Sequence, residues 1–213
     1  MITTTLNRIR EHDPCERGWA KLLCALRKTQ PDNEPLSYGE IVRINGLDAA
    51  LWACRAEPQH ARAWRLFAVW CARQVQHLMQ DQRSIAALDV AERHAHGEAT
   101  DDELIAALAA AYDAYWNIPL DASLDASRIA TRVAAWAASG SAEWYVARSA
   151  SLAVALESCM DATRTAAFDA ALAAAQDATP QTTPQIMQRA AWDAARDAQK
   201  TEFLRLCEQE ISP

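Results

Sequence analysis

A capping box followed by an alanine-rich run decides the fold, and residues 100–116 read TDDELIAALAAAYDAYW. The Thr100 hydroxyl can accept a hydrogen bond from the Glu103 amide while the Glu103 carboxylate reaches back to Thr100, which satisfies two donors at a helix start. Apolar residues then recur at the four-residue spacing of one helix face: Leu104, Leu108, Tyr112 and Trp116. Alanine between them favours the helix because it loses no side-chain entropy on ordering. The stretch therefore predicts a helix.

Alanine is concentrated in the second half of the chain, with 32 Ala in the 113 residues from 101 onward and 15 in the first hundred. A chain of this composition with few helix breakers is predicted to be all-α, forming a multi-helix bundle or an irregular helical array of about 8–10 helices. We expect a single domain over 1–213, with a Trp- and Leu-rich half at 1–99 and an Ala-rich acidic half at 100–213.

Local signals predict where the helices begin and end. Asp13 as an N-cap before Pro14 predicts a helix that runs to Lys28, and Ser37 with Glu40 repeats the capping box. The remaining helices are expected to lie at about 47–57, 58–78, 84–97, 123–138, 142–159, 161–178 and 185–208, with glycines 46 and 97 as stops and a loop at about 179–184.

The region from Pro58 is predicted to be a central helix. Six residues recur at spacings of three and four and share one face: Trp64, Phe67, Ala68, Cys71, Val75 and Leu78. Val69 and Trp70 lie partly off this stripe, so the helix should be covered on more than one side. We expect Trp52 and Trp64 to be buried anchors of the N-terminal half.

The formal net charge of −7 comes from the C-terminal half. Residues 1–100 contain 13 Lys and Arg against 12 Asp and Glu, whereas residues 101–213 contain 8 against 16. An acidic surface repels phosphate backbones, so we expect no direct nucleic-acid partner and favour another protein with a basic surface. The alternative is that the acidity only keeps an Ala-rich surface soluble.

Six cysteines are scattered without a Cys-x-x-Cys pair, and the residues before Pro14 include no apolar leader. These features indicate reduced thiols that fill small apolar positions. A spanning helix needs about 18 consecutive apolar residues, and no such run occurs. We therefore expect a soluble, cytoplasmic protein with no membrane partner, as a monomer or homodimer.

The sequence contains no recognisable catalytic or metal-binding motif. With five glycines, it has no P-loop, dinucleotide fingerprint or nucleophile elbow, and no His-Glu-x-x-His occurs. His94 and His96, two residues apart on a helix, point about 200° from each other and could share an ion only if that helix end were unwound, so an interaction with the negative helix terminus is the better interpretation. Asp101 to Glu103 are explained by helix capping. We therefore expect no metal, no cofactor and no enzymatic activity.

Acidic and tryptophan side chains of the Ala-rich half are the candidate partner-binding residues. They are Asp113, Trp116, Asp121, Asp125, Trp136 and Trp144. Tryptophan is enriched at protein–protein hot spots, but it is also the largest core filler available in this half, and both interpretations stay open. A further ladder of charges on the last helix is typical of a solvated face with ion pairs: Arg189, Asp193, Arg196, Asp197 and Lys200.

Three stretches resemble a known family. Residues 45–55 read NGLDAALWACR, residues 65–72 read RLFAVWCA and residues 97–104 read GEATDDEL, and Ala-rich helices follow. The pattern is similar to that of a family of Ala-rich helical proteins of bacteria and their phages, whose members are often labelled immunity proteins. The resemblance covers about residues 40–210. It implies a non-enzymatic binder that neutralises another protein.

The function expected from these observations is stoichiometric protein binding, either as an immunity or antitoxin-like factor or as a phage-encoded inhibitor of a bacterial defence system. One form of the second alternative is an anti-CRISPR protein that blocks the nucleic-acid channel of an effector with its acidic surface. Another alternative is an enzyme whose site is assembled from dispersed Asp, Glu and His residues in a helical bundle. A third is a scaffolding protein that forms large assemblies.

Overall fold

The computed structural model describes residues 1–117, 126–139, 148–150, 153–154 and 184–209, and their fold is all-α apart from one two-stranded sheet. The elements in chain order are β1 Thr3–Thr4, α1 Leu6–Arg10, α2 Glu16–Ala25, β2 Leu36–Ser37, α3 Tyr38–Asn45, α4 Leu47–Ala53, α5 Ala61–Arg73, α6 Gln82–Ala95, α7 Asp101–Trp116, α8 Ala126–Ser139 and α10 Pro184–Glu208. Short 3₁₀ turns lie at Cys54–Ala56, Pro58–His60 and Gln76–Leu78. The predicted fold class, a helical array, is confirmed.

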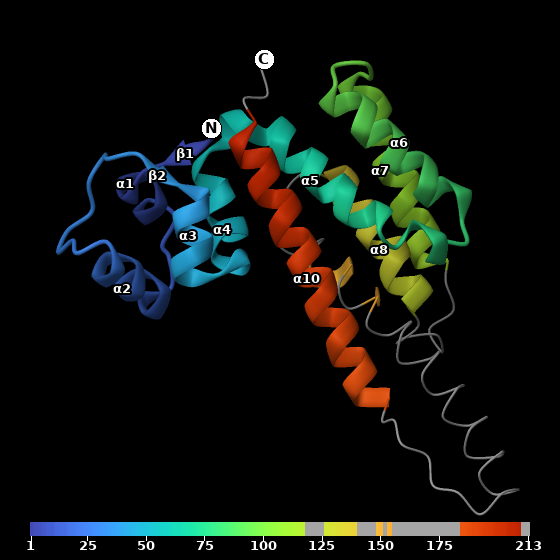
Figure 1. Ribbon diagram of the computed structural model, residues 1–213. Coiled ribbons are helices and arrows are strands. Elements are labelled where there is room, and N and C mark those ends of the chain that lie inside the picture. The colour runs from blue at the N-terminus through green and yellow to red at the C-terminus, as the bar shows by residue number, and fades with distance from the viewer. Residues whose placement is uncertain (118–125, 140–147, 151–152, 155–183, 210–213) are drawn as a thin grey trace, which may run out of the picture.

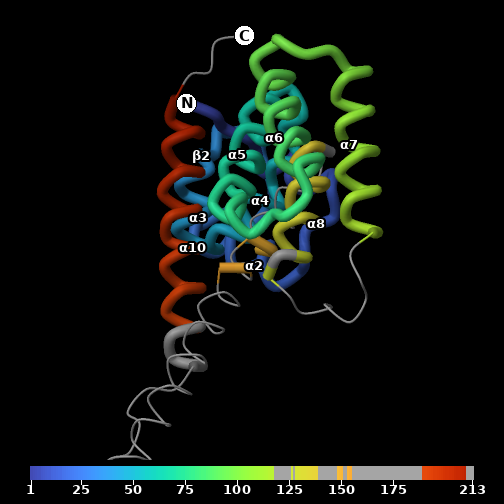
Figure 2. The backbone as a smooth tube through the Cα atoms, turned by 90° about the vertical axis from the view of Figure 1, so that its right-hand side faces the viewer, coloured from blue at the N-terminus to red at the C-terminus, as the bar shows by residue number. Residues whose placement is uncertain are grey.

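Helix α5 joins two groups of helices (Figure 1). Helices α1 to α4 lie on one side of it, and α6, α7 and α8 pack together on the other. The long helix α10 packs along α5 and α3, and its last turn returns to the start of the chain, where the Ile2 amide donates to the Cys207 carbonyl at 2.7 Å. Figure 2 shows α10 and α7 on opposite sides, with α5, α6 and α8 between them.

The main core is an aromatic cluster that joins three helices. Trp64 of α5 lies 5.2 Å from Tyr38 of α3 and 6.0 Å from Phe203 of α10 between ring centroids, and Phe67 lies 5.3 Å from Phe203. The Tyr38 hydroxyl donates to the Ala53 carbonyl at 3.1 Å, and burial raises its pKa. The cluster therefore explains how α10 is held against the N-terminal half.

A second core cluster confirms that α5 is covered on more than one side. Five members of the stripe predicted for residues 58–78 are buried in the main core, and Leu78 is partly buried against it. Val69, from the other side of α5, belongs to a separate cluster with alanines of α6, α7 and α8: Ala87, Ala91, Ala111, Ala135 and Ala138. Small side chains on facing helices permit the close approach of these backbones.

Most predicted helix starts and stops are found. The Thr100 capping box is complete, and the Ser37 hydroxyl accepts from the Glu40 amide at 3.2 Å. Gly46 and Gly97 end α3 and α6 with φ of 87° and 75°, backbone conformations that residues with a Cβ rarely adopt. These signals are local, and so the sequence was sufficient to locate them.

The predicted start of α2 was wrong. Asp13 does not cap the helix, because its φ of 52° places it in a turn after α1, and Cys15 stands at the N-cap without a side-chain hydrogen bond. The helix also ends at Ala25 instead of Lys28 because the chain turns at Arg27, whose φ is 54°. The two strands, of two residues each, are too short to produce the alternation that reveals a strand in sequence.

The predictions for residues 58–78 and for Trp52 need correction. The helix expected over residues 58–78 is regular only over α5, because the chain tightens into 3₁₀ turns before and after it. Trp52 is half-buried, with the Arg55 guanidinium 4.5 Å from its ring centroid, so only Trp64 is a fully buried anchor. Within the charge ladder of α10, Arg189 pairs with Asp193 at 3.0 Å as expected.

The side chain of Arg196 turns inward instead of joining the solvated face of α10. It is 16% exposed and forms an ion pair with Asp48 of α4. Its guanidinium also donates to the Gln199 side chain at 3.0 Å. Arg196 therefore holds α10 against α4.

The helices expected over 142–178 fall mostly outside the described residues. Residues 148–150 and 153–154 are described, and they are helical. Of the loop expected at 179–184, only Pro184 is described, and it is the first residue of α10.

Candidate protein-binding face

The outer face of α7 exposes large apolar side chains. Ile105 is 62% exposed and Trp116 is 71% exposed, and both are among the few large hydrophobic residues at the surface of the described chain. Eleven residues separate them, which is about three helical turns, so they lie on one side of the helix and about 16 Å apart along its axis. Ala109 is exposed between them. We call Ile105, Ala109 and Trp116 the α7 face.

Carboxylates border this face on one side. At 100° per residue, Asp102 and Asp113 are displaced in the same direction from the line through Ile105 and Trp116. Both are exposed. The first turn of α7 contributes further acidic side chains, and its last turn contains no basic residue. The α7 face is therefore an apolar strip with a negatively charged margin.

The capping residues at the start of α7 keep its first turn ordered. The Glu103 carboxylate accepts from the Thr100 amide at 2.8 Å and from the Thr100 hydroxyl at 3.2 Å, and these bonds lower the pKa of Glu103. Asp101 accepts from the His94 ring at 2.7 Å, which ties this turn to the end of α6. The acidic residues here are thus partly engaged in structure, as predicted for Asp101 to Glu103.

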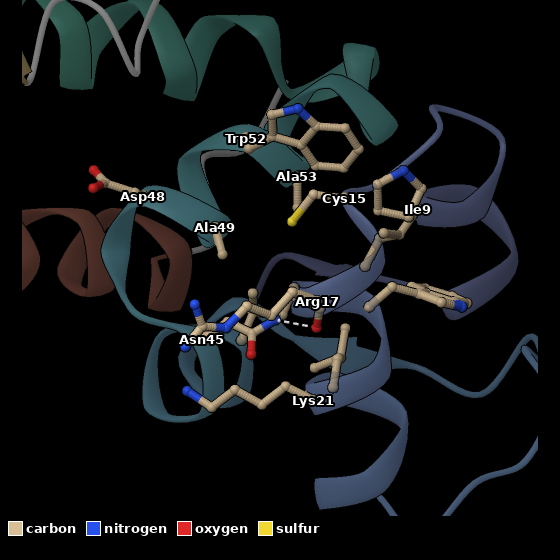
Figure 3. A pocket seen from close by; sticks show the side chains of 14 residues that line it. Ile9, Cys15, Arg17, Lys21, Asn45, Asp48, Ala49, Trp52 and Ala53 are labelled. Atoms are coloured by element: carbon tan, nitrogen blue, oxygen red, sulfur yellow. Dashed lines mark hydrogen bonds between the residues drawn. The ribbon is translucent and has the colours of Figure 1, made fainter.

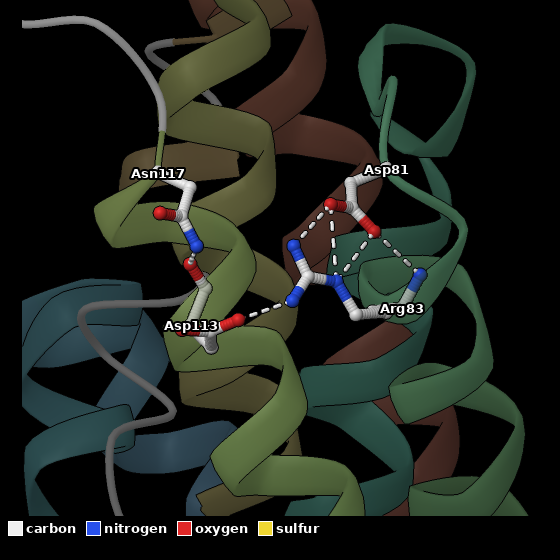
Figure 4. A network of polar contacts seen from close by, with 4 residues as sticks. All are labelled: Asp81, Arg83, Asp113 and Asn117. Atoms are coloured by element: carbon white, nitrogen blue, oxygen red, sulfur yellow. Dashed lines mark hydrogen bonds and ion pairs between the residues drawn. The ribbon is translucent and has the colours of Figure 1, made fainter.

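Asp113 is held by a polar network that joins α6 and α7 (Figure 4). The Arg83 guanidinium forms an ion pair with Asp113 and a second with Asp81 at 2.7 Å. The hydrogen bond to Asp81 raises the pKa of Arg83 the most, and the hydrogen bond to Asp113 raises it further. The Asn117 side chain donates to the Asp113 carbonyl at 2.8 Å. Asp113, a predicted partner-binding residue, is thus 62% exposed but already paired within the chain.

Trp116 is placed at the surface by its aromatic neighbour. The rings of Trp116 and Tyr115 meet edge to face with centroids 5.1 Å apart, and the Arg128 guanidinium of α8 lies 5.4 Å from the Tyr115 ring. Tyr115 is half-buried. It therefore anchors the end of α7 to α8, while Trp116 keeps most of its surface in solvent. Trp116 is the site prediction whose surroundings best suit partner binding.

Trp136 has a different environment. It is partly buried against the main core, and the Arg132 guanidinium lies 4.7 Å from its ring centroid. This favours core filling, the alternative considered for each tryptophan. The other three predicted residues, Asp121, Asp125 and Trp144, lie outside the described residues.

Sequence reasoning missed Ile105 and Ala109. The available signal was that α7 carries apolar residues around much of its circumference, more than the contacts of one buried stripe require. Leu104 is buried in the second cluster and Leu108 and Tyr112 pack against it, which uses one side of the helix. At 100° per residue, Ile105 and Trp116 lie only about 20–40° from Tyr112, at the edge of this side, and they are left for solvent or a partner.

The two histidines near α7, His94 and His96, each contact the guanidinium of an arginine. The Arg65 guanidinium lies 2.8 Å from Nδ1 of His94, and that of Arg62 lies 3.2 Å from Nδ1 of His96. Since a guanidinium only donates, each of these ring nitrogens accepts. Within the described residues, no three His, Cys, Asp or Glu side chains gather in a way that could hold a metal ion.

Clustering of Glu or His around a cleft would favour the enzyme alternative. The cavity between α2 and α4, of about 590 Å³, has one carboxylate in its lining, Asp48, and no histidine. A second cavity, of about 400 Å³, is lined by Glu92, His96 and Glu202, and both glutamates are paired with arginines. Over the described part of the chain, none of the helices combines the length and apolar character required to cross a membrane.

No protein-family model, curated protein or solved structure matches this chain.

Proposed function

We propose that this protein binds another protein and neutralises it without catalysis, using the α7 face as the centre of the contact. The observation that carries the proposal is the exposure of Ile105 and Trp116 on one side of a well-formed helix. Large apolar side chains left in water are unfavourable, and burying one completely contributes about 1.5–3 kcal/mol, of which the exposed parts of Ile105 and Trp116 can supply most.

The geometry suits a hot spot. Tryptophan at the centre of a contact is a frequent source of binding energy, and Trp116 presents its ring from a position set by Tyr115. Helix α7 is held by its capping box and by the Arg83–Asp113 ion pair. A preformed helix loses little conformational entropy on binding, so more of the contact energy is retained as affinity.

The partner should have an apolar pocket beside a basic surface. Asp102 and Asp113 border the apolar strip, and residues 101–213 contain twice as many acidic as basic side chains. Opposite charge around an apolar centre speeds association and rejects acidic competitors. This manner of action is the one expected of an immunity protein or of a phage-encoded inhibitor of bacterial defence.

The test compares capture by matched variants. Immobilised wild-type protein, Trp116→Ala and Ile105→Glu are incubated with host lysate, with Ala20→Glu as the control because Ala20 is exposed on α2, away from α7. We expect one basic protein to be retained by the wild type and the control and lost from both α7 variants. Retention by all four proteins, with unchanged circular dichroism, would contradict the proposal.

Salt dependence separates an apolar contact from acidic blocking of a nucleic-acid channel. With the α7 face at the centre, salt should slow association and leave the dissociation rate nearly unchanged. An inhibitor that acts through charge alone would lose most of its affinity between low and high salt. Surface plasmon resonance with the captured partner at two salt concentrations measures both rates.

A further inference from the structure

A second candidate site lies on the other side of the molecule, between α2 and the α3–α4 pair. The cavity there has a volume of about 590 Å³, which is within the range of small-molecule sites. Its walls are mostly apolar and include Trp19 and Leu22 from α2, Ile41 from α3, and Ala49 and Trp52 from α4. Figure 3 shows Trp52 and Ala49 on one wall, facing α2 across the opening.

Two cations stand at the edge of this cavity. Arg17 and Lys21 are one turn apart on α2, both are exposed, and Figure 3 shows both side chains extending across the opening. Among the described residues, no ion pair engages either of them. The lining's single carboxylate, Asp48, is already paired with Arg196 and lies 4.0 Å from Arg148. The cavity therefore has a net positive edge.

The wall that carries these cations is fixed in place. The Asn45 side chain donates to the Gly18 carbonyl at 2.9 Å, which ties the end of α3 to α2 beside the opening (Figure 3). A Cβ at Gly18 would lie 3.0 Å from the Cys15 sulfur and 3.7 Å from the Asn45 amide nitrogen. The close contact is therefore with the N-cap of α2 itself, whereas the distance toward α3 is an ordinary packing distance, and the Asn45 hydrogen bond is what ties the two helices together.

We infer that this cavity binds a small amphipathic carboxylate of the fatty-acid class. The apolar tail lies between Trp19 and Trp52, and the carboxylate is held by Arg17 and Lys21. The charge at the edge selects this ligand over a neutral or cationic one of the same shape, because the two cations have no competing partner within the described chain. The inference does not depend on the role proposed for the α7 face.

Calorimetric titration with decanoate and with decanol tests the charge selection. We expect decanoate to bind at a single site and decanol to bind roughly tenfold more weakly, with affinity rising roughly tenfold from octanoate to decanoate as two more methylenes are buried. Equal affinity for decanoate and decanol, or no saturable binding of decanoate, would overturn the inference.

Matched variants locate the site. Arg17→Gln with Lys21→Gln should weaken decanoate roughly tenfold and leave decanol unchanged, while Arg43→Gln, exposed on α3 outside the lining, should have no effect. Ala49→Phe should weaken both ligands, and Ala20→Phe on the outer side of α2 should weaken neither. Binding that is indifferent to the double variant would overturn the inference even if Ala49→Phe failed to fold.

Two further outcomes are decisive. Decanoate should still bind Trp116→Ala, because α7 lies on the far side of α5 (Figure 1); this separates the result from a failure of the protein-binding proposal. If the cavity instead receives a second copy of this chain, sedimentation would show a dimer that decanoate does not dissociate, and the inference would be wrong.

Discussion

The ring of Phe203 stands edge-on to the ring of Phe67, with the centroids 5.3 Å apart and the planes at 71°. Both side chains are fully buried. Phe203 also lies against Trp64 and Tyr38, so one side chain of the last helix completes the aromatic cluster of the N-terminal half. The docking of α10 therefore depends on an apolar contact between residues far apart in the chain.

Removing the Phe203 ring should weaken the whole fold. Phe203→Ala leaves a cavity among three aromatic rings and is expected to lower the free energy of unfolding by about 3–5 kcal/mol. Urea denaturation followed by tryptophan fluorescence measures the change. Lys200→Ala, on the exposed side of the same helix, should shift it by less than about 0.5 kcal/mol. Similar losses for both variants would mean that α10 does not depend on its core contact.

The two tryptophans of the N-terminal half should differ in their contribution. Trp64 is buried, and its Nε1 donates to the Glu57 carbonyl at 3.1 Å, so Trp64→Ala should cost about 3–5 kcal/mol. Trp52 is half-buried, and Trp52→Ala should cost about 1–2 kcal/mol because less apolar surface is removed from water in the native state. Chemical denaturation of both variants measures the two losses in free energy of unfolding. Equal losses would contradict the expected order.

The capping box should give acid-sensitive stability. Hydrogen bonds from the Thr100 amide and hydroxyl lower the pKa of Glu103 below its ordinary value of 4.5. A lowered carboxylate pKa stabilises the fold above the ordinary value, and this stabilisation is lost as the pH falls through the lowered value. We expect the wild type to have a higher melting temperature than Glu103→Gln at pH 7, and we expect the difference between the two melting temperatures to shrink below pH 4.5. The exposed Glu98→Gln is the control. A difference that grows in acid would contradict the assignment.

The cysteines should react in two classes. Cys15 and Cys24 are exposed, whereas burial raises the pKa of Cys71 and raises that of Cys207 to about 12. At pH 8 a thiol with that pKa is ionised to roughly one part in ten thousand, and thiolate is the reactive form. A Cys159→Ser background treated with iodoacetamide and mapped by mass spectrometry should therefore show the first pair modified in the native protein. Rapid labelling of Cys207 would contradict its burial.

Much of the fold could be predicted because its signals are local. The Thr100 capping box, the Ser37 cap and the glycine stops each depend on residues within one turn, and the stripe of α5 depends on spacing within one helix. The start of α2 could not be predicted in the same way. Asp13 and Pro14 have the composition of a cap, but the turn that follows α1 places Asp13 at positive φ and moves the helix start onward.

The candidate site was predictable in part. Trp116 was singled out from its residue type, and the structure places it at the surface; Asp113 was singled out from its charge, and the structure pairs it with Arg83, 30 residues earlier. That pairing depends on how α6 and α7 pack, which no local pattern records. The cavity beside α2 was not anticipated, because its walls come from separate helices that are apolar for different local reasons.

The sequence by itself determined that the chain is helical and where most of its helices begin, since alanine content, caps and three-to-four spacing act over one or two turns. Only the tertiary structure decided which apolar residues are covered. Phe203 and Ile105 are both large apolar side chains on helices, yet one completes the core and the other is left in solvent. The difference arises from packing between distant helices, because burial of an apolar side chain depends on the surfaces that meet it in space.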